Sequence, residues 1–478
     1  MMPDTATALR DVRSLPGPRP WPLLGNVLQM PPRRMHKVVE DWARRFGSLF
    51  VIYFARTPIL VVADTALIAA ILRDRPDGFR RPAITAMVSD ELGGYPGVFL
   101  AEGAEWRNQR RMVMQGFAPH AIKAYFPSLV KVALRLEARW QGAAHSGRAI
   151  DLALDLKRYT VDIIAGLAFG AEVNTLDTGE DAIQGHIDEV LTGTARRTVS
   201  PVPYWRWFKL PQDRRLERSL AALQGAVDGF VAKARARMQA DPGLHERPQN
   251  LLEAMLAAGD KPDSGVTDAT VAGNVSTMLM AGEDTTANTL AWLIWLLSRH
   301  PAALARAQEE VRRLAPQTGA FTLEQMDALE FVDACAQEAM RLKPVAPFIP
   351  LEAVRDTVVG DVPVKAGAFV WCVLRHETVD DAHFANAATF DPQRWLQADA
   401  RHKASMPFGS GPRLCPGRYL ALLEIKIAMA LLLGRFDISA VEAVDGGEPK
   451  EVMGFVMQPG RMRMRLDLHC QHGEVMAR

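Results

Sequence analysis

The chain has 478 residues, of which 48% are hydrophobic, and it is long enough for one large core or two to three ordinary domains. Its net charge of +1 excludes the overall positive field that attracts nucleic acid or an anionic membrane. Its four cysteines form no CxxC pair, which argues against a disulfide framework and favours a cytoplasmic location.

The N-terminal part is interpreted from its apolar runs and its prolines. No run within residues 1–30 is long enough for a signal peptide or a membrane span, so we expect no membrane span. Residues 1–15 are predicted to be disordered, and the proline-rich stretch up to Pro22 cannot be helical. Helical periodicity covers residues 31–46. No second linker follows, so we predict a single domain over residues 16–478.

Two strands, a helix and a loop are predicted next. Residues 47–64 have the pattern of two apolar strands around a turn at Ala55–Pro58, and residues 65–73 return to helix. Residues 80–100 contain two prolines and three glycines between apolar residues, which predicts a long irregular loop. Long loops are unusual in compact domains unless they are functional.

The following third of the chain is mainly helical. Trp106 and Arg110 are four residues apart at the start of a predicted helix, so they share one face. Residues 151–170 are predicted to form a core helix. Residues 199–211 contain three prolines and four aromatic residues, which indicates a connection between helices. Its aromatic side chains either pack against the protein, touch a membrane or help to admit an apolar substrate.

The longest helical run begins at Thr267 or Asp268, either of which can cap it, and ends before His300. It is apolar on most sides, as expected for a helix through the centre of a protein. Its middle, residues 281–286, nevertheless contains AGEDTT. A buried acid and a glycine both cost stability in a helix, so this hexapeptide indicates a function.

A charged pair follows in the last third of the chain. Glu338 and Arg341 are three residues apart on a predicted helix over residues 331–343. Residues 345–373 then alternate in the manner of strands. Such charged pairs are common on surfaces and mean little alone.

Cys415 lies between a glycine-rich loop and an apolar run from Pro416 to Leu433 that is predicted to be helical. A position just before a helix N-terminus favours the thiolate over the thiol. A thiolate held in a dry loop is either a metal ligand or a nucleophile.

The loop pattern Phe408-Gly409-x-Gly411-x-Arg413-x-Cys415-x-Gly417 resembles the haem-binding loop of the cytochrome P-450 superfamily. The Trp106 motif, the AGEDTT hexapeptide and the Glu338-x-x-Arg341 pair stand at suitable spacing before it. This resemblance implies a mainly α fold with a smaller β region, in which a triangular helical domain encloses haem b. It also implies a soluble protein of bacterial type, because the hydrophobic anchor of membrane-bound relatives is missing before the proline-rich hinge.

The resemblance assigns roles residue by residue. Cys415 would be the axial thiolate ligand of the haem iron, and Asp284 and Thr285 would be catalytic, delivering protons to the bound oxygen molecule. Glu338, Arg341 and Arg394 would form a structural cluster. The residues implied to bind the cofactor are Trp106, Arg110, Ala281, Gly282, Phe408, Arg413, Cys415 and Gly417.

One departure from the family pattern concerns the strand near Leu351. Many bacterial relatives carry a propionate-binding arginine there, whereas the nearest arginine in this chain is Arg355. The expected pocket residues are nearly all apolar, which predicts a terpenoid, steroid or fatty-acid-like substrate. They are Ile84, Met87, Val88, Phe99, Leu279, Phe348, Ile349, Phe455 and Val456.

The implied reaction is the insertion of one oxygen atom from O2 into a hydrophobic small molecule. No flavin, Rossmann or iron–sulfur motif is present in the sequence, so a separate ferredoxin or flavodoxin with its reductase would supply electrons to a monomer. Basic residues for that contact are Arg110, Arg111, Lys403 and Arg418. A peroxide-driven peroxygenase and a non-enzymatic haem sensor are the alternatives, and the Asp284–Thr285 pair argues against both.

Overall fold

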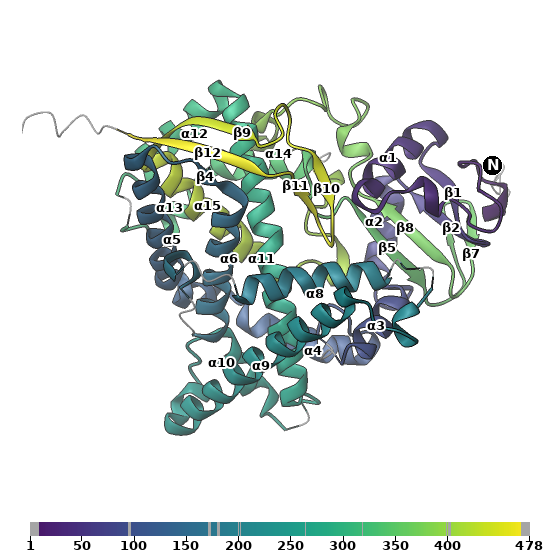
Figure 1. Ribbon diagram of the computed structural model, residues 1–478, viewed down its shortest axis with the longest axis horizontal. Coiled ribbons are helices and arrows are strands. Elements are labelled where there is room, and N and C mark those ends of the chain that lie inside the picture. Colours follow the sequence, from purple (N-terminus) through teal and green to yellow (C-terminus); the bar gives the residue numbers. More distant parts are fainter. Residues whose placement is uncertain are drawn as a thin grey trace, which may run out of the picture.

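The computed structural model describes residues 9–469 except 94–96, 171–173, 179–181, 199, 201, 263, 318, 398 and 400–402. Helices make up one side of the molecule and a sheet-rich part that includes the N-terminal region makes up the other (Figure 1). The helices are α1 Met35–Phe46, α2 Thr65–Arg73, α3 Ala83–Glu91, α4 Gly103–Gly116, α5 Pro119–Ser146, α6 Leu152–Phe169, α7 Thr175–Thr178, α8 Ala182–Thr198, α9 Pro211–Ala240, α10 Leu251–Gly259, α11 Asp268–Arg299, α12 Pro301–Leu314, α13 Leu323–Asp327, α14 Glu330–Leu342 and α15 Arg418–Arg435.

The strands form one larger sheet and three small ones. The larger sheet has the order β1-β2-β8-β5-β3, in which β2 and β8 are parallel and the other neighbours antiparallel. The strands are β1 Leu49–Phe54, β2 Thr57–Val62, β3 Phe79–Arg80, β4 Ile150–Asp151, β5 Phe348–Ala353, β6 Thr357–Val359, β7 Val362–Val364, β8 Phe369–Val373, β9 Phe436–Ala443, β10 Glu451–Met453, β11 Met457–Pro459 and β12 Met462–Leu468.

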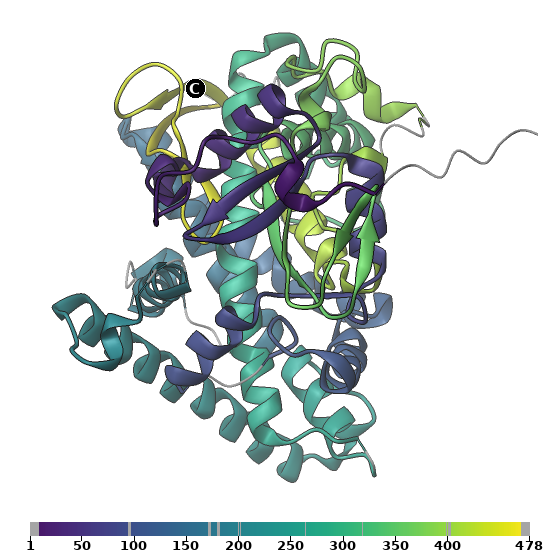
Figure 2. The ribbon, with the colours of Figure 1, turned by 90° about the vertical axis from the view of Figure 1, so that its right-hand side faces the viewer.

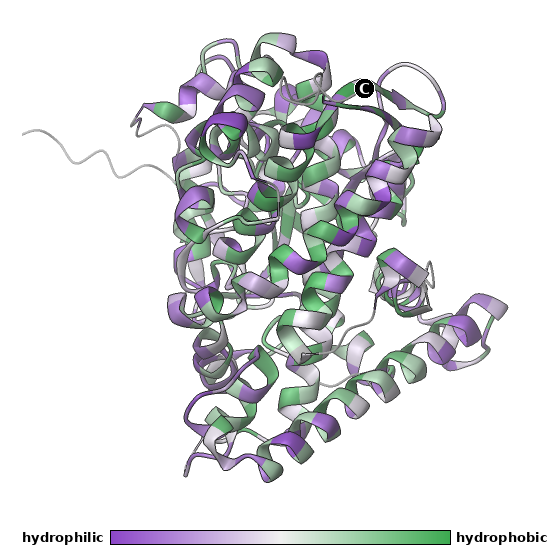
Figure 3. Ribbon diagram, turned by 90° about the vertical axis from the view of Figure 1, so that its left-hand side faces the viewer, coloured by the Kyte–Doolittle hydropathy of each residue, from purple (hydrophilic) through white to green (hydrophobic). Residues whose placement is uncertain are grey.

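Helix α11 organises the helical part. It runs through the middle of the molecule from one end to the other (Figure 2). Thr267 caps it by accepting a hydrogen bond from the Thr270 backbone, and residues 286–297 are all buried. The cap and the 32-residue length confirm the sequence prediction. Hydrophobic residues gather along this helix and its neighbours, while the outer helices carry more hydrophilic residues (Figure 3).

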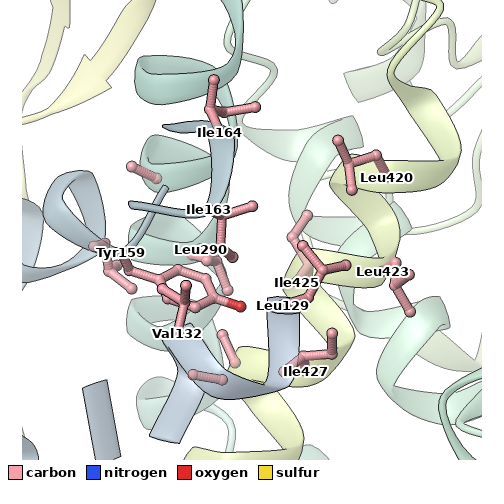
Figure 4. Packing of buried hydrophobic residues seen from close by; sticks show 14 of the residues in the cluster. Leu129, Val132, Tyr159, Ile163, Ile164, Leu290, Leu420, Leu423, Ile425 and Ile427 are labelled. Carbon is pink, nitrogen blue, oxygen red and sulfur yellow. The ribbon is translucent and has the colours of Figure 1, made fainter. Parts of the chain in front are cut away.

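The main core lies where α5, α6, α11 and α15 meet. Leu129, Ile163, Leu290 and Ile425 come from these four helices and approach one another in the close-up (Figure 4). The Tyr159 hydroxyl donates a hydrogen bond to the Glu424 carbonyl at 3.0 Å, which ties α6 to α15. Two smaller cores pack on the two faces of the larger sheet.

Two predictions about the N-terminal region need correction. Residues 9–15 belong to the described part, and Val12–Ser14 form a 3-10 turn followed by buried Leu15, so the predicted disorder does not hold there. The predicted loop over residues 80–100 contains helix α3 at Ala83–Glu91, while residues 94–96 lie outside the described residues. The predictions for α1, the β1–β2 hairpin, α2 and α6 are confirmed.

The connection over residues 199–211 sorts its aromatic side chains into two groups. Trp205 is buried, and its indole N–H donates to Glu91 at 2.8 Å. Trp207 and Phe208 are exposed. In the part of the chain that the structure describes, we find no helix with the length and apolarity needed to cross a bilayer.

Candidate functional site

The loop before α15 holds Cys415 in a fixed position. The Cys415 backbone N–H donates to the Phe408 carbonyl at 3.0 Å, and a short 3-10 turn, Gly411–Arg413, lies between the two. Gly411 has φ +71°, and a Cβ there would lie 2.5 Å from the Leu72 carbonyl oxygen, so only glycine fits. Gly417 is the residue before α15, which places Cys415 at that helix N-terminus as predicted.

Opposing effects act on the Cys415 thiol. Burial raises its pKa, while the Gly417 backbone N–H and the nearby Arg110 lower it. Arg110, on α4, also donates to the Leu414 carbonyl at 2.7 Å and so braces the loop. Because burial dominates, a full thiolate here needs a stronger positive charge beside the sulfur, such as a metal ion.

An arginine-rich cluster lies beside this loop. The Arg413 guanidinium sits over the buried Trp106 ring at 4.8 Å from its centroid. Arg413 also donates to the Ala101 carbonyl at 2.7 Å and pairs with Glu102. Two of the predicted cofactor-binding residues, Trp106 and Arg413, therefore lie together. A third, Arg110, donates instead to the Leu414 carbonyl.

Two further arginines, Arg75 and Arg81, belong to the cluster. Burial lowers the pKa of each, and for Arg81 the neighbouring charges of Arg75 and Arg413 lower it further. The pKa of Arg413 falls to about 10, mainly through burial. Arg81 donates to the Phe99 carbonyl at 2.8 Å, but Nε and Nη2 of Arg75 have no partner within the described residues.

This cluster of Arg75, Arg81, Arg110 and Arg413 with Glu102 carries an excess of positive charge. Buried guanidinium groups without partners are costly, so the site suits an anion that brings two carboxylates. The two propionates of haem meet that requirement, and the residues present fit the group. Arg75 and Arg81 were not predicted, and the only signal for Arg81 is the Arg80-Arg81 pair before Pro82.

Arg355 does not join this cluster. It is exposed and pairs with Asp74 at 2.7 Å, while Leu351 is fully buried in a sheet core. The strand that contains Leu351 therefore contributes no arginine to the cluster. Arg75 and Arg81, before α3, and Arg413, in the Cys415 loop, supply the positive charge instead.

The middle of α11 has two different faces. Ala281 is exposed although Leu279 and Glu283 on the same helix are buried, and the Thr285 hydroxyl donates to the Ala281 carbonyl at 2.6 Å. Gly282 instead faces α6, where an added Cβ would lie 2.6 Å from Ile164 Cδ1. Asp284 is buried, lies 2.7 Å from Lys157 of α6, and has its pKa raised mainly by burial. Within the hexapeptide, Gly282 thus packs against α6, whereas Ala281 lies on an exposed face of the helix.

The segment before α4 is fastened to α11. The Val98 backbone N–H donates to Asn274 at 2.9 Å, and Asn274 donates to Gln109 of α4 at 2.9 Å. Phe99, next in this segment, lies 5.9 Å from Phe455 of the C-terminal hairpin, ring centroid to ring centroid. Two predicted pocket residues from distant parts of the chain are therefore neighbours.

The other predicted pocket residues are placed less uniformly. Phe348 stacks on Trp371 at 5.4 Å in a sheet core, so its ring is committed to packing there. Val88, Leu279 and Val456 are buried. Met87 and Phe455 are just exposed, and Ile84 and Ile349 are half-buried.

The Glu338 carboxylate is the centre of a buried ionic cluster. It accepts from Arg341 at 2.7 and 2.8 Å, from Arg394 at 3.0 Å and from the Trp395 indole at 2.8 Å. Arg341 also donates to the Ala387 carbonyl at 2.8 Å. The three residues of the predicted structural cluster are thus in contact, and they fix the segment that leads towards the Cys415 loop.

A groove of about 440 Å³ lies directly beside the Cys415 loop. Phe408, Gly409 and Leu414 line it from the loop, and the basic residues Lys403 and Arg418 line it as well. Glu330 and Asp333 of α14 add negative charge to the same groove. Arg110 does not line it.

A fold of this kind with a single cysteine before a long buried helix and an acid–threonine pair in the central helix defines a haem-thiolate protein. The sequence profile of the family Cytochrome P450 matches residues 15–466, so the chain belongs to the cytochrome P450 family, whose members carry haem. By this membership it is a cytochrome P450 monooxygenase.

The similar proteins come from several kingdoms. The chain is 26% identical to the chloroplastic protein LUTEIN DEFICIENT 5 of Arabidopsis thaliana, over 82% of this chain and 67% of that protein. It is 26% identical to a chloroplastic carotene epsilon-monooxygenase of the same plant, over 88% of this chain and 78% of the relative. It is 27% identical to a bifunctional cytochrome P450/NADPH–P450 reductase of Bacillus cereus, over 90% of this chain but only 40% of the relative.

The fold has a close counterpart among solved structures. The crystal structure of the cytochrome P450DA heme domain superposes with a TM-score of 0.84 at 25% identity, covering 97% of this chain and 99% of that one. The predicted mainly α fold with a smaller β region is therefore confirmed.

Proposed function

We propose that this chain binds haem b and inserts one oxygen atom from O2 into a hydrophobic small molecule, by hydroxylation or epoxidation. The observation that carries this proposal is the Asp284–Thr285 pair in the middle of α11, with the Thr285 hydroxyl beside the exposed Ala281 and Asp284 buried against Lys157. A protein that only stores or senses haem has no use for two costly polar residues at this place.

The chain's own residues have separable tasks. Cys415 would hold the haem iron, and Trp106, Arg75, Arg81 and Arg413 would hold the propionates. The haem, when bound, supplies the oxidising chemistry that a thiolate ligand promotes. Asp284 and Thr285 would together deliver protons to the bound oxygen molecule. The apolar residues around the site would exclude water and orient the substrate.

The substrate is proposed to be a medium to large apolar molecule. Phe99 and Phe455 come together from distant parts of the chain, and the predicted pocket residues are apolar. One relative is named a carotene epsilon-monooxygenase, which is in line with the terpenoid member of the proposed terpenoid, steroid or fatty-acid-like substrates.

Electrons are proposed to come from a separate ferredoxin or flavodoxin with its reductase, delivered to a cytoplasmic monomer. Lys403 and Arg418 line the groove beside the Cys415 loop together with Glu330 and Asp333, and these two basic residues support the docking of an acidic donor there. The reductase-fused relatives show that an attached donor is the other arrangement in the family.

The direct test compares two sources of oxidising equivalents. We expect product from a lipophilic test substrate when purified protein receives electrons from a surrogate ferredoxin system under O2, and little from hydrogen peroxide alone. Binding of each test substrate is measured beforehand by the shift of the haem absorption band. Turnover with peroxide but none with electrons and O2 would instead assign the chain to the peroxygenases.

A further inference from the structure

The hairpin of β10 and β11 carries two of the expected pocket residues, Phe455 and Val456, in its turn. In the part of the chain that the structure describes, its strands, Glu451–Met453 and Met457–Pro459, pair only with each other. The Phe455 ring lies 5.9 Å from the Phe99 ring, centroid to centroid, and β11 contacts the central helix α11 (Figure 1). A two-stranded hairpin is at best marginally stable by itself, so the position of the turn depends on what anchors the strands.

The hairpin is anchored at one point by its backbone and at another by a side chain. The Met457 backbone N–H donates to the Val345 carbonyl at 2.7 Å, which fixes the start of β11. At the start of β10, Glu451 is 7% exposed. Its carboxylate accepts hydrogen bonds from the Lys343 ammonium at 2.6 Å and from the Arg375 guanidinium at 2.9 Å. The side-chain anchor is therefore a buried ionic one.

The ionic anchor joins the hairpin to three other elements. Lys343 directly follows α14, and Arg375 lies two residues after β8. From α1, His36 Nε2 lies 3.2 Å from the Glu451 carboxylate, and Glu40 accepts from Arg375 at 2.7 and 2.9 Å. Burial acts to raise the pKa of Glu451, but the His36 contact and the charges of Arg375 and Lys343 hold it well below its ordinary value. The carboxylate is therefore ionised at neutral pH.

The anchor and the pocket residues lie at the two ends of one short strand. Glu451 begins β10, and Phe455 follows it by four positions, in a turn that the Gly454 N–H closes by donating to the Val456 carbonyl at 3.0 Å. A strand rises about 3.3 Å per residue, so a shift at Glu451 is transmitted over roughly 13 Å to the turn. The ionic contacts of Glu451 therefore set where the Phe455 ring stands.

We propose that Glu451 is a positioning residue for substrate recognition, which through β10 places Phe455 and Val456 against the far end of a long apolar substrate. A ligand too short to reach the hairpin does not depend on Glu451. The inference rests on the proposed function, because it concerns how that same site selects its substrate. Its test, however, uses ligands that bind the haem iron and requires no turnover.

The test compares two iron-binding ligands that differ in length, imidazole and 1-dodecylimidazole. Each is titrated into the haem-loaded protein, and its Kd is measured from the shift of the haem absorption band. Glu451→Gln should raise the Kd of 1-dodecylimidazole about tenfold, the loss expected when one apolar contact is misplaced. It should leave the Kd of imidazole unchanged. Glu448→Gln, which changes an exposed acid three positions earlier, is the matched control and should alter neither Kd.

A double-mutant cycle separates positioning from general loosening of the fold. Phe455→Ala should weaken the binding of 1-dodecylimidazole by itself, and Glu451→Gln should add nothing further in that background, because it acts through Phe455. Two results would overturn the proposal: an equal weakening of both imidazoles in Glu451→Gln, or an effect of Glu451→Gln that is undiminished in the Phe455→Ala background.

A second variant decides the matter if Glu451→Gln does not retain haem. Lys343→Met removes one donor and leaves Arg375 and His36 on the carboxylate, so it should raise the Kd of 1-dodecylimidazole in the same direction but by a smaller factor. An unchanged ratio of the two Kd values in this variant overturns the proposal.

The outcomes for the two proposals are distinguishable. If the wild type gives no product with electrons and O2, the proposed function fails, and the two imidazoles still decide whether Glu451 positions the hairpin. If the wild type turns over and Glu451→Gln keeps the wild-type ratio of the two Kd values, only the positioning role is wrong.

Discussion

Arg75 is the arginine of the cluster whose guanidinium has the fewest protein partners among the described residues. It is 5% exposed, and two of its guanidinium nitrogens have no partner among the described residues. A buried donor without a partner costs about 1–3 kcal/mol, more when it is charged. The haem-free protein should therefore be destabilised by the same side chain that helps to hold the haem propionates.

Arg75→Met should have opposite effects on the two forms of the protein. The free energy of unfolding of the haem-free variant should be about 1–3 kcal/mol higher than that of the haem-free wild type, because an unpaired charge is removed. Haem should dissociate about tenfold faster or more, because a charge-assisted hydrogen bond is lost. Denaturant unfolding measures the stability of the haem-free protein, and haem transfer to an acceptor protein measures the rate of haem dissociation.

The control for this experiment is Arg73→Met, which removes an exposed arginine two residues earlier. It should change neither quantity. Slower or unchanged haem loss in Arg75→Met would exclude Arg75 from propionate binding.

Local patterns explain which site residues the sequence could predict. Cys415, Asp284 and Thr285 each lie within a short segment whose composition is unusual for a helix or a turn. Arg75 and Arg81 could not be found in this way, because their importance comes from a shared space with Arg413 more than 300 positions away. A cluster assembled from three segments leaves no periodic signal in any of them.

At the scale of elements, the contact between α6 and α11 places the site. Gly282 allows α6 to approach so closely that an added Cβ would lie 2.6 Å from Ile164 Cδ1 and 2.8 Å from Cγ1. The same approach brings Lys157 of α6 within reach of Asp284. The glycine of the hexapeptide therefore has a packing role that the resemblance to the family alone did not indicate.

Gly282→Ala should test this contact. Overpacking costs about 1–3 kcal/mol, which outweighs the gain of up to about 1 kcal/mol from better helix propensity. In an Ile164→Ala background the clash is absent, so Gly282→Ala should become neutral or stabilising. The free energy of unfolding of the four proteins in this cycle gives the coupling directly.

Gly166→Ala is the matched control, because Gly166 is helical and a Cβ there would meet nothing within 4 Å. It should stabilise the protein slightly. An equal effect of Gly282→Ala in both backgrounds would show that Ile164 is not the neighbour that requires glycine.

Elements with strong periodicity were predicted well, whereas one helix between a proline and two glycines, α3, was not. The length and cap of α11 followed from its apolar pattern and from Thr267. Helix α3 escapes prediction because Pro82 and the glycines from Gly93 onward also have the pattern of a loop. Pro82 in fact immediately precedes the helix, and the glycines follow its end at Glu91.

For the whole molecule, the decisive contacts join distant parts of the chain. Strand β2 pairs in parallel with β8 more than 300 positions later, and Phe99 meets Phe455. Such pairings have no local signature, so the sequence indicated the class of fold but not which strands are neighbours. The Glu338–Arg341–Arg394 cluster is an exception, since the resemblance to the family implied that these residues meet.

The central claim, that Cys415 is the axial ligand of a bound haem, is tested most directly by the absorption spectrum of the reduced carbon-monoxide complex. The control is Cys335→Ser, which replaces another cysteine that is buried and far from the loop in sequence. The wild type and Cys335→Ser should both show the red-shifted Soret band of thiolate-ligated haem, and Cys415→Ser should lose it. An imidazole-type band in the intact wild type, or a red-shifted band that survives in Cys415→Ser, would contradict the account.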